Sequence, residues 1–214
     1  MFRNFAADLR GAPWPVWLIL GLCLLPEALF LTTSVGLIDA PRARAIAYDN
    51  FGFWAGLLGN WQPNYASQPW LMFLSYGFLH AGPVHFAVNM LTLLALGGPV
   101  AQAVGPWRFL ALYLMFAVAG AIGFALVPEL GLPMVGASGA LFGLAGLLLA
   151  WDWRYRRRRK MTLWPVLRSL GILVLLNLVL WVAMGGHLAW QTHLGGFLAG
   201  WGMGWLVQPD QRRG

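Results

Sequence analysis

Three short stretches of the chain carry side chains that could perform acyl transfer. They read His80-xxxx-His85-xxx-Asn89, Gly136-Ala137-Ser138-Gly139 and His193-Leu194-Gly195-Gly196. A serine hydroxyl that gives its proton to an imidazole can attack a carbonyl carbon, and nearby N–H groups can stabilise the oxyanion that forms. Each stretch alone also fits ordinary packing, because small residues and hydrogen-bonded histidines are common where membrane helices meet. The chemistry therefore depends on whether the fold brings the three stretches together.

The composition predicts an integral membrane protein. Of the 214 residues, 59% are hydrophobic and 10% are charged, and the mean hydropathy is +0.66. A soluble domain is about half apolar and about a quarter charged. The single cysteine, Cys23, excludes an intrachain disulfide. The sequence has no His-Glu-x-x-His motif and no cysteine pair, so no zinc motif appears.

The apolar runs predict six membrane spans in one all-α domain, residues 14–207. The spans cover residues 14–31, 83–100, 107–127, 138–151, 166–184 and 190–207, with cytoplasmic segments at 1–13 and 208–214. The first run could be a signal peptide, but it is long and no clear small-x-small cleavage site follows it, so we expect a retained helix. Glu27 in this run is expected to make an interfacial or interhelical hydrogen bond.

The fourth span is expected to be short. Residues 138–151 would form a helix about 21 Å long at 1.5 Å per residue, which cannot cross a hydrocarbon core of about 30 Å. Its first residue, Ser138, is therefore predicted to lie inside the membrane, at the floor of a cavity.

The longest connection, residues 32–79, is rich in aromatic side chains. Residues 45–58 are too short and too interrupted by glycine to span a membrane. We expect short helices half embedded in the outer surface of the membrane, because aromatic residues favour that interface. The alternative is a compact folded loop without lipid contact.

The basic residues are distributed unevenly between the two predicted sides of the membrane. The net charge is +7, and only two of the fourteen Lys and Arg residues, Arg42 and Arg44, fall on the side opposite the termini. The positive-inside rule therefore predicts that both termini are cytoplasmic. The cluster at residues 154–160 is interpreted as a topology anchor near anionic lipid headgroups, and not as a nucleic-acid site.

The outer ends of spans two, four and six collect the reactive side chains. His85 and Asn89 are four residues apart and share one helix face. Two glycine stripes would let spans four and six approach closely and would bring Ser138 to His193. The stripes are Gly139, Gly143 and Gly146 on span four, and Gly196, Gly200 and Gly204 on span six. No Asp or Glu is placed to orient His193, so we predict a Ser–His dyad.

The ordered set of motifs resembles the bacterial rhomboid intramembrane serine proteases, in a minimal six-helix form. The resemblance implies that Ser138 is the nucleophile and His193 the base, and that His85 and Asn89 line an oxyanion hole with the Ser138 N–H. The remaining implied roles are a structural His80, motif glycines Gly136 and Gly139, Phe142 packed on the imidazole, and Gly196 at the crossing of spans four and six. The sequence departs from the family where Leu71, not arginine, follows Trp70, and where Thr192 replaces an alanine.

By this resemblance the protein would cleave transmembrane segments of membrane-protein substrates near their outer ends, within a bacterial inner membrane, and would use no metal and no cofactor. The turn 185–189 and the start of span six are expected to move when a substrate binds, because paired glycines are suitable hinges. One alternative is an inactive rhomboid-like protein that binds membrane clients, although such relatives typically lack the serine or the histidine. Another is a transporter, although the sequence shows no convincing repeat.

Overall fold

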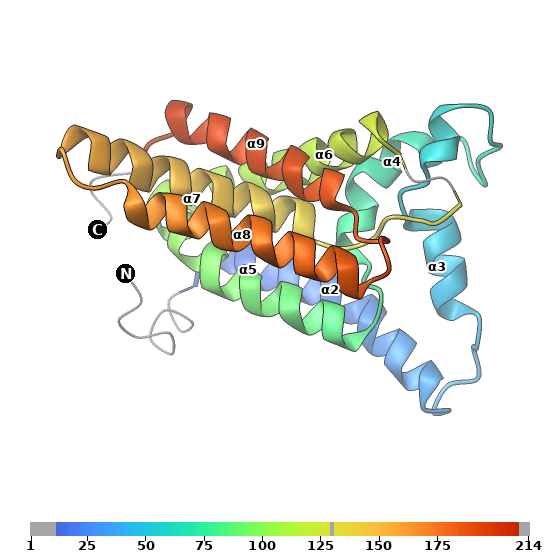
Figure 1. The fold of residues 1–214 in the computed structure, drawn as a ribbon. Helices are drawn as coiled ribbons and strands as arrows, with labels where there is room; N and C mark the ends of the chain where they lie inside the picture. Colours follow the sequence, from blue (N-terminus) through green and yellow to red (C-terminus); the bar gives the residue numbers. More distant parts are fainter. Residues whose placement is uncertain (1–11, 129–130, 210–214) are drawn as a thin grey trace.

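The computed structural model describes residues 12–128 and 131–209, and the expected cytoplasmic segments fall largely outside these ranges. The regular secondary structure of the described residues is helical. Their β-structure is limited to an isolated bridge between Phe53 and Met134. Six long helices form the bundle of Figure 1: α2 Trp14–Ser34, α5 Pro83–Val104, α6 Pro106–Leu126, α7 Ser138–Arg158, α8 Trp164–Ala183 and α9 Trp190–Leu206. Among the described helices, α2, α5, α6 and α8 are long and apolar enough to cross a membrane.

Helix α7 begins at Ser138 as predicted, but it is not short. It has 21 residues and continues past Trp151 through the basic segment to Arg158. Arginine favours helix, positive charge favours a helix C-terminus, and the pair between Arg156 and Asp152 at 2.8 Å supports the last turns. Figure 1 shows α7 shifted along the bundle, so that its start lies further inside than the start of α5. The prediction of a short helix is therefore wrong, and the position of Ser138 within the membrane stays a prediction.

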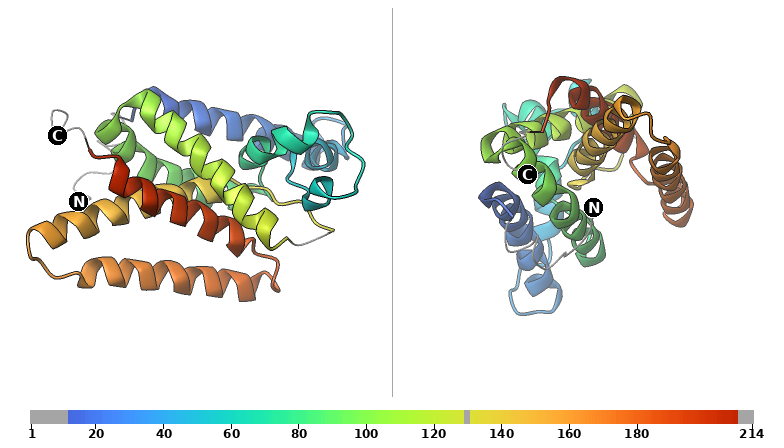
Figure 2. Two further views of the ribbon diagram at one scale, coloured as in Figure 1. Left: turned by 90° about the horizontal axis from the view of Figure 1, so that it is seen from above. Right: turned by 90° about the vertical axis from the view of Figure 1, so that its left-hand side faces the viewer.

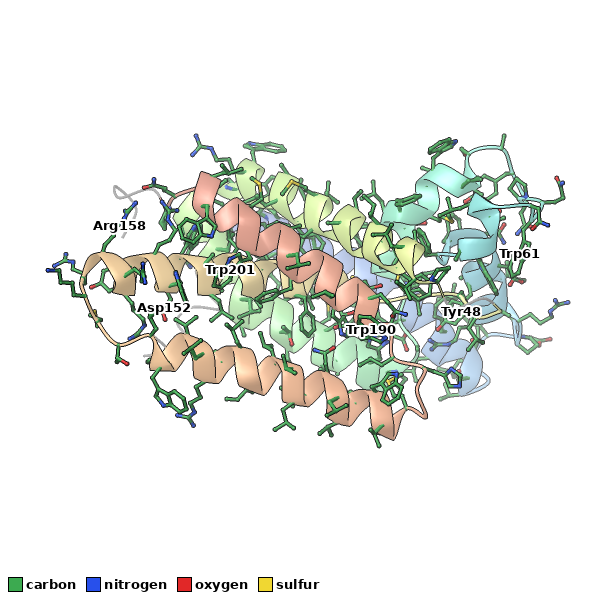
Figure 3. All side chains as sticks on the ribbon, turned by 45° about the horizontal axis from the view of Figure 1, so that its top comes forward. Tyr48, Trp61, Asp152, Arg158, Trp190 and Trp201 are labelled. Carbon is green, nitrogen blue, oxygen red and sulfur yellow. The ribbon has the colours of Figure 1, made fainter. Side chains whose placement is uncertain are left out.

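The first connection folds into short helices at the end of the bundle opposite the basic residues. They are α3 Ala43–Phe51, η1 Ala55–Leu58, α4 Gln68–Ser75 and η2 Tyr76–Phe78. A small apolar cluster holds them on α6 and on the segment before α7: Phe53, Met72, Tyr76, Ala121, Phe124 and Met134 are all buried. Figure 3 places Tyr48 and Trp61 at this end and Arg158 at the other. The expected short helices are therefore present, and they form a folded unit with its own core.

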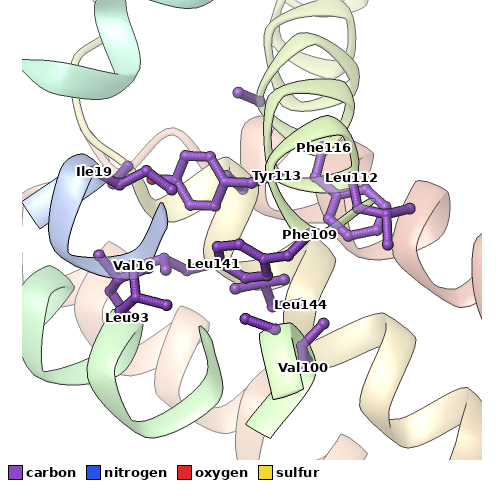
Figure 4. Close-up of a cluster of buried hydrophobic side chains, with 14 of the residues drawn as sticks. Val16, Ile19, Leu93, Val100, Phe109, Leu112, Tyr113, Phe116, Leu141 and Leu144 are labelled. Atoms are coloured by element: carbon purple, nitrogen blue, oxygen red, sulfur yellow. The ribbon is translucent and has the colours of Figure 1, made fainter. Parts of the chain in front are cut away.

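The main core lies where α2, α5, α6 and α7 meet. Figure 4 shows side chains from all four helices, including Val16, Leu93, Phe109 and Leu144, which are fully buried. The helices are apolar on nearly all sides, as expected when the outside is lipid and not water. This core fixes α7, which carries the serine, in the middle of the bundle.

Glycines bring α7 against α9, as the two predicted stripes require. A Cβ added at Gly196 would overlap the Gly139 carbonyl, and one added at Gly200 would overlap the Gly143 carbonyl. The sequence reasoning missed that α6 joins this contact: Gly120 lies against Gly139, and a Cβ at Gly123 would contact the Gly195 backbone at 3.0 Å. The three helices therefore pack backbone to backbone, which only glycine permits.

Helix α8 stands at the edge of the bundle. Figure 2 shows it outside the other helices, and Val166 is its only fully buried residue. A turn through Gly185 and Gly186, with φ values of 62° and 91°, then leads into α9. The turn lies where the sequence predicted it, beside the start of α9.

Candidate active site

The structure brings Ser138 and His193 into direct contact. Ser138 is the first residue of α7, and its Oγ lies 2.9 Å from Nε2 of His193, in the first turn of α9. Phe142, one turn after the serine, stacks on the imidazole with ring centroids 4.2 Å apart and planes within 8°. His193 is 7% exposed. The glycine contact between α7 and α9 thus presents a hydroxyl to an imidazole whose ring plane is held by an aromatic neighbour.

Gly136 allows the chain to enter α7 close to α5. Its φ is 129°, in the region that side chains disfavour, and its N–H donates to the Tyr76 carbonyl at 3.0 Å. A Cβ at Gly136 would meet the His85 ring within 3 Å and Asn89 Nδ2 at 3.6 Å. This glycine therefore lets two polar side chains of α5 approach the segment that ends at Ser138.

Both α5 side chains present N–H donors to this segment. The Ala81 N–H donates to Nδ1 of His85 at 3.2 Å, so the neutral ring carries its proton on Nε2, which lies 2.9 Å from the position that a Cβ at Gly136 would take. Asn89 is buried, and its Nδ2 has no protein partner among the described residues. A buried donor without a partner is unfavourable unless a ligand or water satisfies it. The two donors are therefore available to a group bound beside Ser138.

His80 anchors the first connection through its backbone. Its carbonyl accepts hydrogen bonds of 2.6 Å from Arg44 Nη1 and from the Tyr48 hydroxyl. Its ring packs edge-on against His85 at 5.3 Å, and burial, with the charges of His85 and Arg44, lowers the pKa of His80 to about 3. Its imidazole is therefore neutral at ordinary pH, as suits a structural histidine inside the fold.

Glu27 pairs with Arg44, one of the two arginines on this side of the bundle. Arg44 Nη2 lies 2.9 Å from Glu27 Oε1, and Nη1 lies 3.2 Å from Oε2. The hydrogen bond expected of Glu27 is therefore present, but its partner belongs to α3 and not to a spanning helix. It ties the first connection to α2 and, through the His80 carbonyl, to the start of α5.

Asn177 is the residue of this site that the sequence reasoning missed. Its Oδ1 lies 2.6 Å from Nδ1 of His193, on the side of the ring opposite Ser138. The search for a partner of His193 considered only Asp and Glu. The available signal was an amide in the middle of an apolar helix, where polar side chains commonly bond to a neighbouring helix.

The comparison with protein families matches the sequence of this chain to one of them. The Rhomboid domain matches residues 67–210, which include all the residues of the site. The chain belongs to the rhomboid family.

Relatives of the rhomboid chain occur in bacteria, fungi and plants. Rhomboid protease GluP of Bacillus subtilis is 33% identical over 136 residues, which are 63% of this chain and 25% of that protein. Rhomboid-type serine protease 2 of Emericella nidulans is 31% identical over 145 residues, 66% of this chain and 28% of the relative. RHOMBOID-like protein 5 of Arabidopsis thaliana is 33% identical over 138 residues, which are 61% of this chain and 41% of that protein. The matches thus span less than half the length of these relatives.

The two departures from the rhomboid pattern have separate structural outcomes. Trp70 is 77% exposed, and the loop is held instead by Gln68, whose Nε2 donates to the Asp49 carbonyl at 2.6 Å. The Thr192 hydroxyl contacts Met134 Sδ, and its methyl group faces Gly139. No group of three or more His, Cys, Asp or Glu residues that could hold a metal ion occurs in the described part of the chain.

Proposed function

We propose that this rhomboid chain is an intramembrane serine endopeptidase that cleaves transmembrane segments of membrane proteins. The observation that carries the proposal is the 2.9 Å contact between Ser138 Oγ and His193 Nε2, with Phe142 stacked on the imidazole. A bare Nε2 at hydrogen-bond distance from a hydroxyl is the arrangement that activates a serine nucleophile. The names of two relatives, which include the word protease, support the same reaction class.

In the proposed reaction Ser138 Oγ attacks the carbonyl carbon of the scissile peptide, and its proton passes to His193 Nε2. The carbonyl oxygen becomes an oxyanion that accepts hydrogen bonds from His85 Nε2, Asn89 Nδ2 and the Ser138 N–H at the start of α7. The imidazolium then gives its proton to the leaving amine nitrogen. Water hydrolyses the acyl-enzyme by the same route in reverse, and Ser138 is regenerated.

The charge distribution supports an orientation in a bacterial inner membrane. Both termini would be cytoplasmic, with the basic end of α7 among anionic headgroups and the reactive residues opening to the outer side. Water would reach Ser138 from that side. Substrates would be membrane proteins whose transmembrane segments end near the same surface, and the reaction would need neither a metal nor a cofactor.

Cleavage of a single-span test protein by the purified chain in liposomes tests the proposal. Ser138→Ala and His193→Ala should each reduce cleavage by at least about a thousandfold, because both groups take part in every proton transfer. Ser169→Ala is the matched control, since that hydroxyl bonds the Pro165 carbonyl at 3.0 Å within α8 and should leave cleavage unchanged. Circular dichroism should show all variants folded.

Two outcomes would count against the proposal. Cleavage that survives Ser138→Ala would identify a contaminant or a different nucleophile. No cleavage by any form, across several substrates, would instead favour the inactive client-binding alternative.

A further inference from the structure

Asn177 sits on the inner face of an otherwise apolar stretch of α8. No other amide, hydroxyl or charged side chain occurs between Leu170 and Ala183. Asn177 is partly buried, as are Leu170 and Leu173 on the same stripe, whereas Leu175 and Leu176 are exposed. An amide facing lipid would lack partners, so its position towards α9 gives it hydrogen bonds that the lipid face could not provide.

The two hydrogen bonds of Asn177 fix the orientation of its amide. Nδ2 donates to the Leu173 carbonyl at 3.0 Å, and Oδ1 faces Nδ1 of His193 at 2.6 Å. Turning the amide over would place Oδ1 against the Leu173 carbonyl, where two acceptors would face each other. Because an amide oxygen only accepts, Nδ1 of His193 must carry the proton and donate it. The opposite nitrogen, Nε2, is then bare and faces the Ser138 hydroxyl.

We propose that Asn177 is a positioning residue that holds His193 in the Nδ1–H tautomer, so that Nε2 can accept the serine proton. The inference rests on the proposed protease function. Phe142 fixes the plane of the ring from its face, and Asn177 fixes the rotation of the ring within that plane. When Nε2 takes the proton, the amide oxygen remains hydrogen-bonded to Nδ1 and stabilises the positive charge without receiving a proton itself.

The surroundings of this contact strengthen it. Asn177 and His193 line an apolar cavity of about 210 Å³ between α7, α8 and α9, whose other walls include Phe142, Leu173 and Phe197. None of the described residues that line the cavity is an Asp, Glu, Lys or Arg. A hydrogen bond in a medium of low polarity is stronger than one in water, and an unpaired Nδ1–H there would be costly. Asn177 is therefore the acceptor that makes the Nδ1–H tautomer the favoured one.

Kinetic measurements on Asn177 variants in liposomes test the role of the acceptor. Asn177→Leu keeps a similar side-chain volume but removes the hydrogen-bond acceptor. It should lower kcat about 10- to 100-fold with little change in KM. Asn177→Asp restores an acceptor and should recover most of the loss. Leu170→Ala, on the same cavity wall but without a bond to His193, is the control for packing and should keep kcat near wild type. Melting temperatures should show that all three variants fold.

Nitrogen NMR of the histidine side chains tests the tautomer directly and does not require protease activity. The signal of His193 is identified by its loss in His193→Ala. It should report a protonated Nδ1 and a bare Nε2 at neutral pH, and Asn177→Leu should shift the proton towards Nε2. A bare Nδ1 in the wild-type protein, or an unchanged kcat in Asn177→Leu, would overturn the inference. If no form cleaves any substrate, the protease proposal fails, and the NMR result alone then decides whether Asn177 positions the ring.

Discussion

Helices α7 and α8 both place a side chain against the His193 imidazole, but they pack in opposite ways. Where α7 meets α9, glycines on one helix touch backbone carbonyls on the other, with no room for a methyl group. Helix α8 has a single fully buried residue, Val166, and stands outside the bundle. The comparison indicates that the distance between Ser138 and His193 is fixed by rigid packing, whereas the Asn177 acceptor depends on where α8 lies.

The largest expected effect is the loss of the close contact itself. In Gly200→Val the new side chain would overlap the Gly143 carbonyl, so α9 would have to move away from α7. We expect destabilisation of about 3 kcal/mol or more and no detectable cleavage. Unfolding in bicelles and the liposome cleavage assay would measure the two effects.

Gly202→Ala is the matched control for this prediction, on the same helix. A Cβ at Gly202 meets no atom within 4 Å, and alanine favours helix, so its stability should be equal or slightly higher. If Gly200→Val folded and cleaved like Gly202→Ala, the dyad would not depend on close packing.

The same substitution, leucine to alanine, should lower the unfolding free energy much more on α7 than on α8. Leu144 on α7 is fully buried, whereas Leu175 on α8 is 58% exposed. Leu144→Ala leaves a cavity and should cost about 2 kcal/mol or more, while Leu175→Ala should change the unfolding free energy by less than about 0.5 kcal/mol. Equal losses in bicelles would mean that α8 is as firmly packed as α7.

For a physical reason, the sequence predicted the contact between α7 and α9 better than the position of α8. Glycine spacing at intervals of three and four residues records a helix contact directly, so the approach of Ser138 to His193 could be inferred from the stripes. The start of α7 and the bounds of α9 followed, within a residue, from the apolar runs. The extension of α7 to Arg158 was missed because charge was taken as the end of the span, although arginine continues a helix readily.

The contacts of single polar residues could not be predicted in the same way. Asn177 meets His193 only because the turn after α8 sets the position of that helix, and hydropathy contains no such information. Likewise, the pairing of Glu27 with Arg44 crosses from α2 to the first connection. Each polar residue was visible as an exception in its segment, but its partner depended on tertiary geometry.

The smallest expected effect concerns movement of the α8 side of the molecule. The start of α5 and the end of α8 lie at the same end of the bundle (Figure 1). In a Cys23→Ala background, cysteines at Val84 and His187 joined by a flexible thiol-reactive linker should slow cleavage of a transmembrane substrate about tenfold. The reason is that, under the proposed function, a helical substrate would pass between these elements, whereas α7 and α9 would stay in contact throughout.

A short water-soluble peptide provides the internal control for this prediction. It can approach Ser138 from the outer side without parting the helices, so the linked protein should cleave it at nearly the unlinked rate. The single-cysteine variants treated with the same reagent should cleave both substrates normally. Unchanged cleavage of the transmembrane substrate after linking would show that α8 and its turn need not move. Equal slowing of both substrates would instead show that the linker disturbs the dyad, and α8 would then belong with the rigid region.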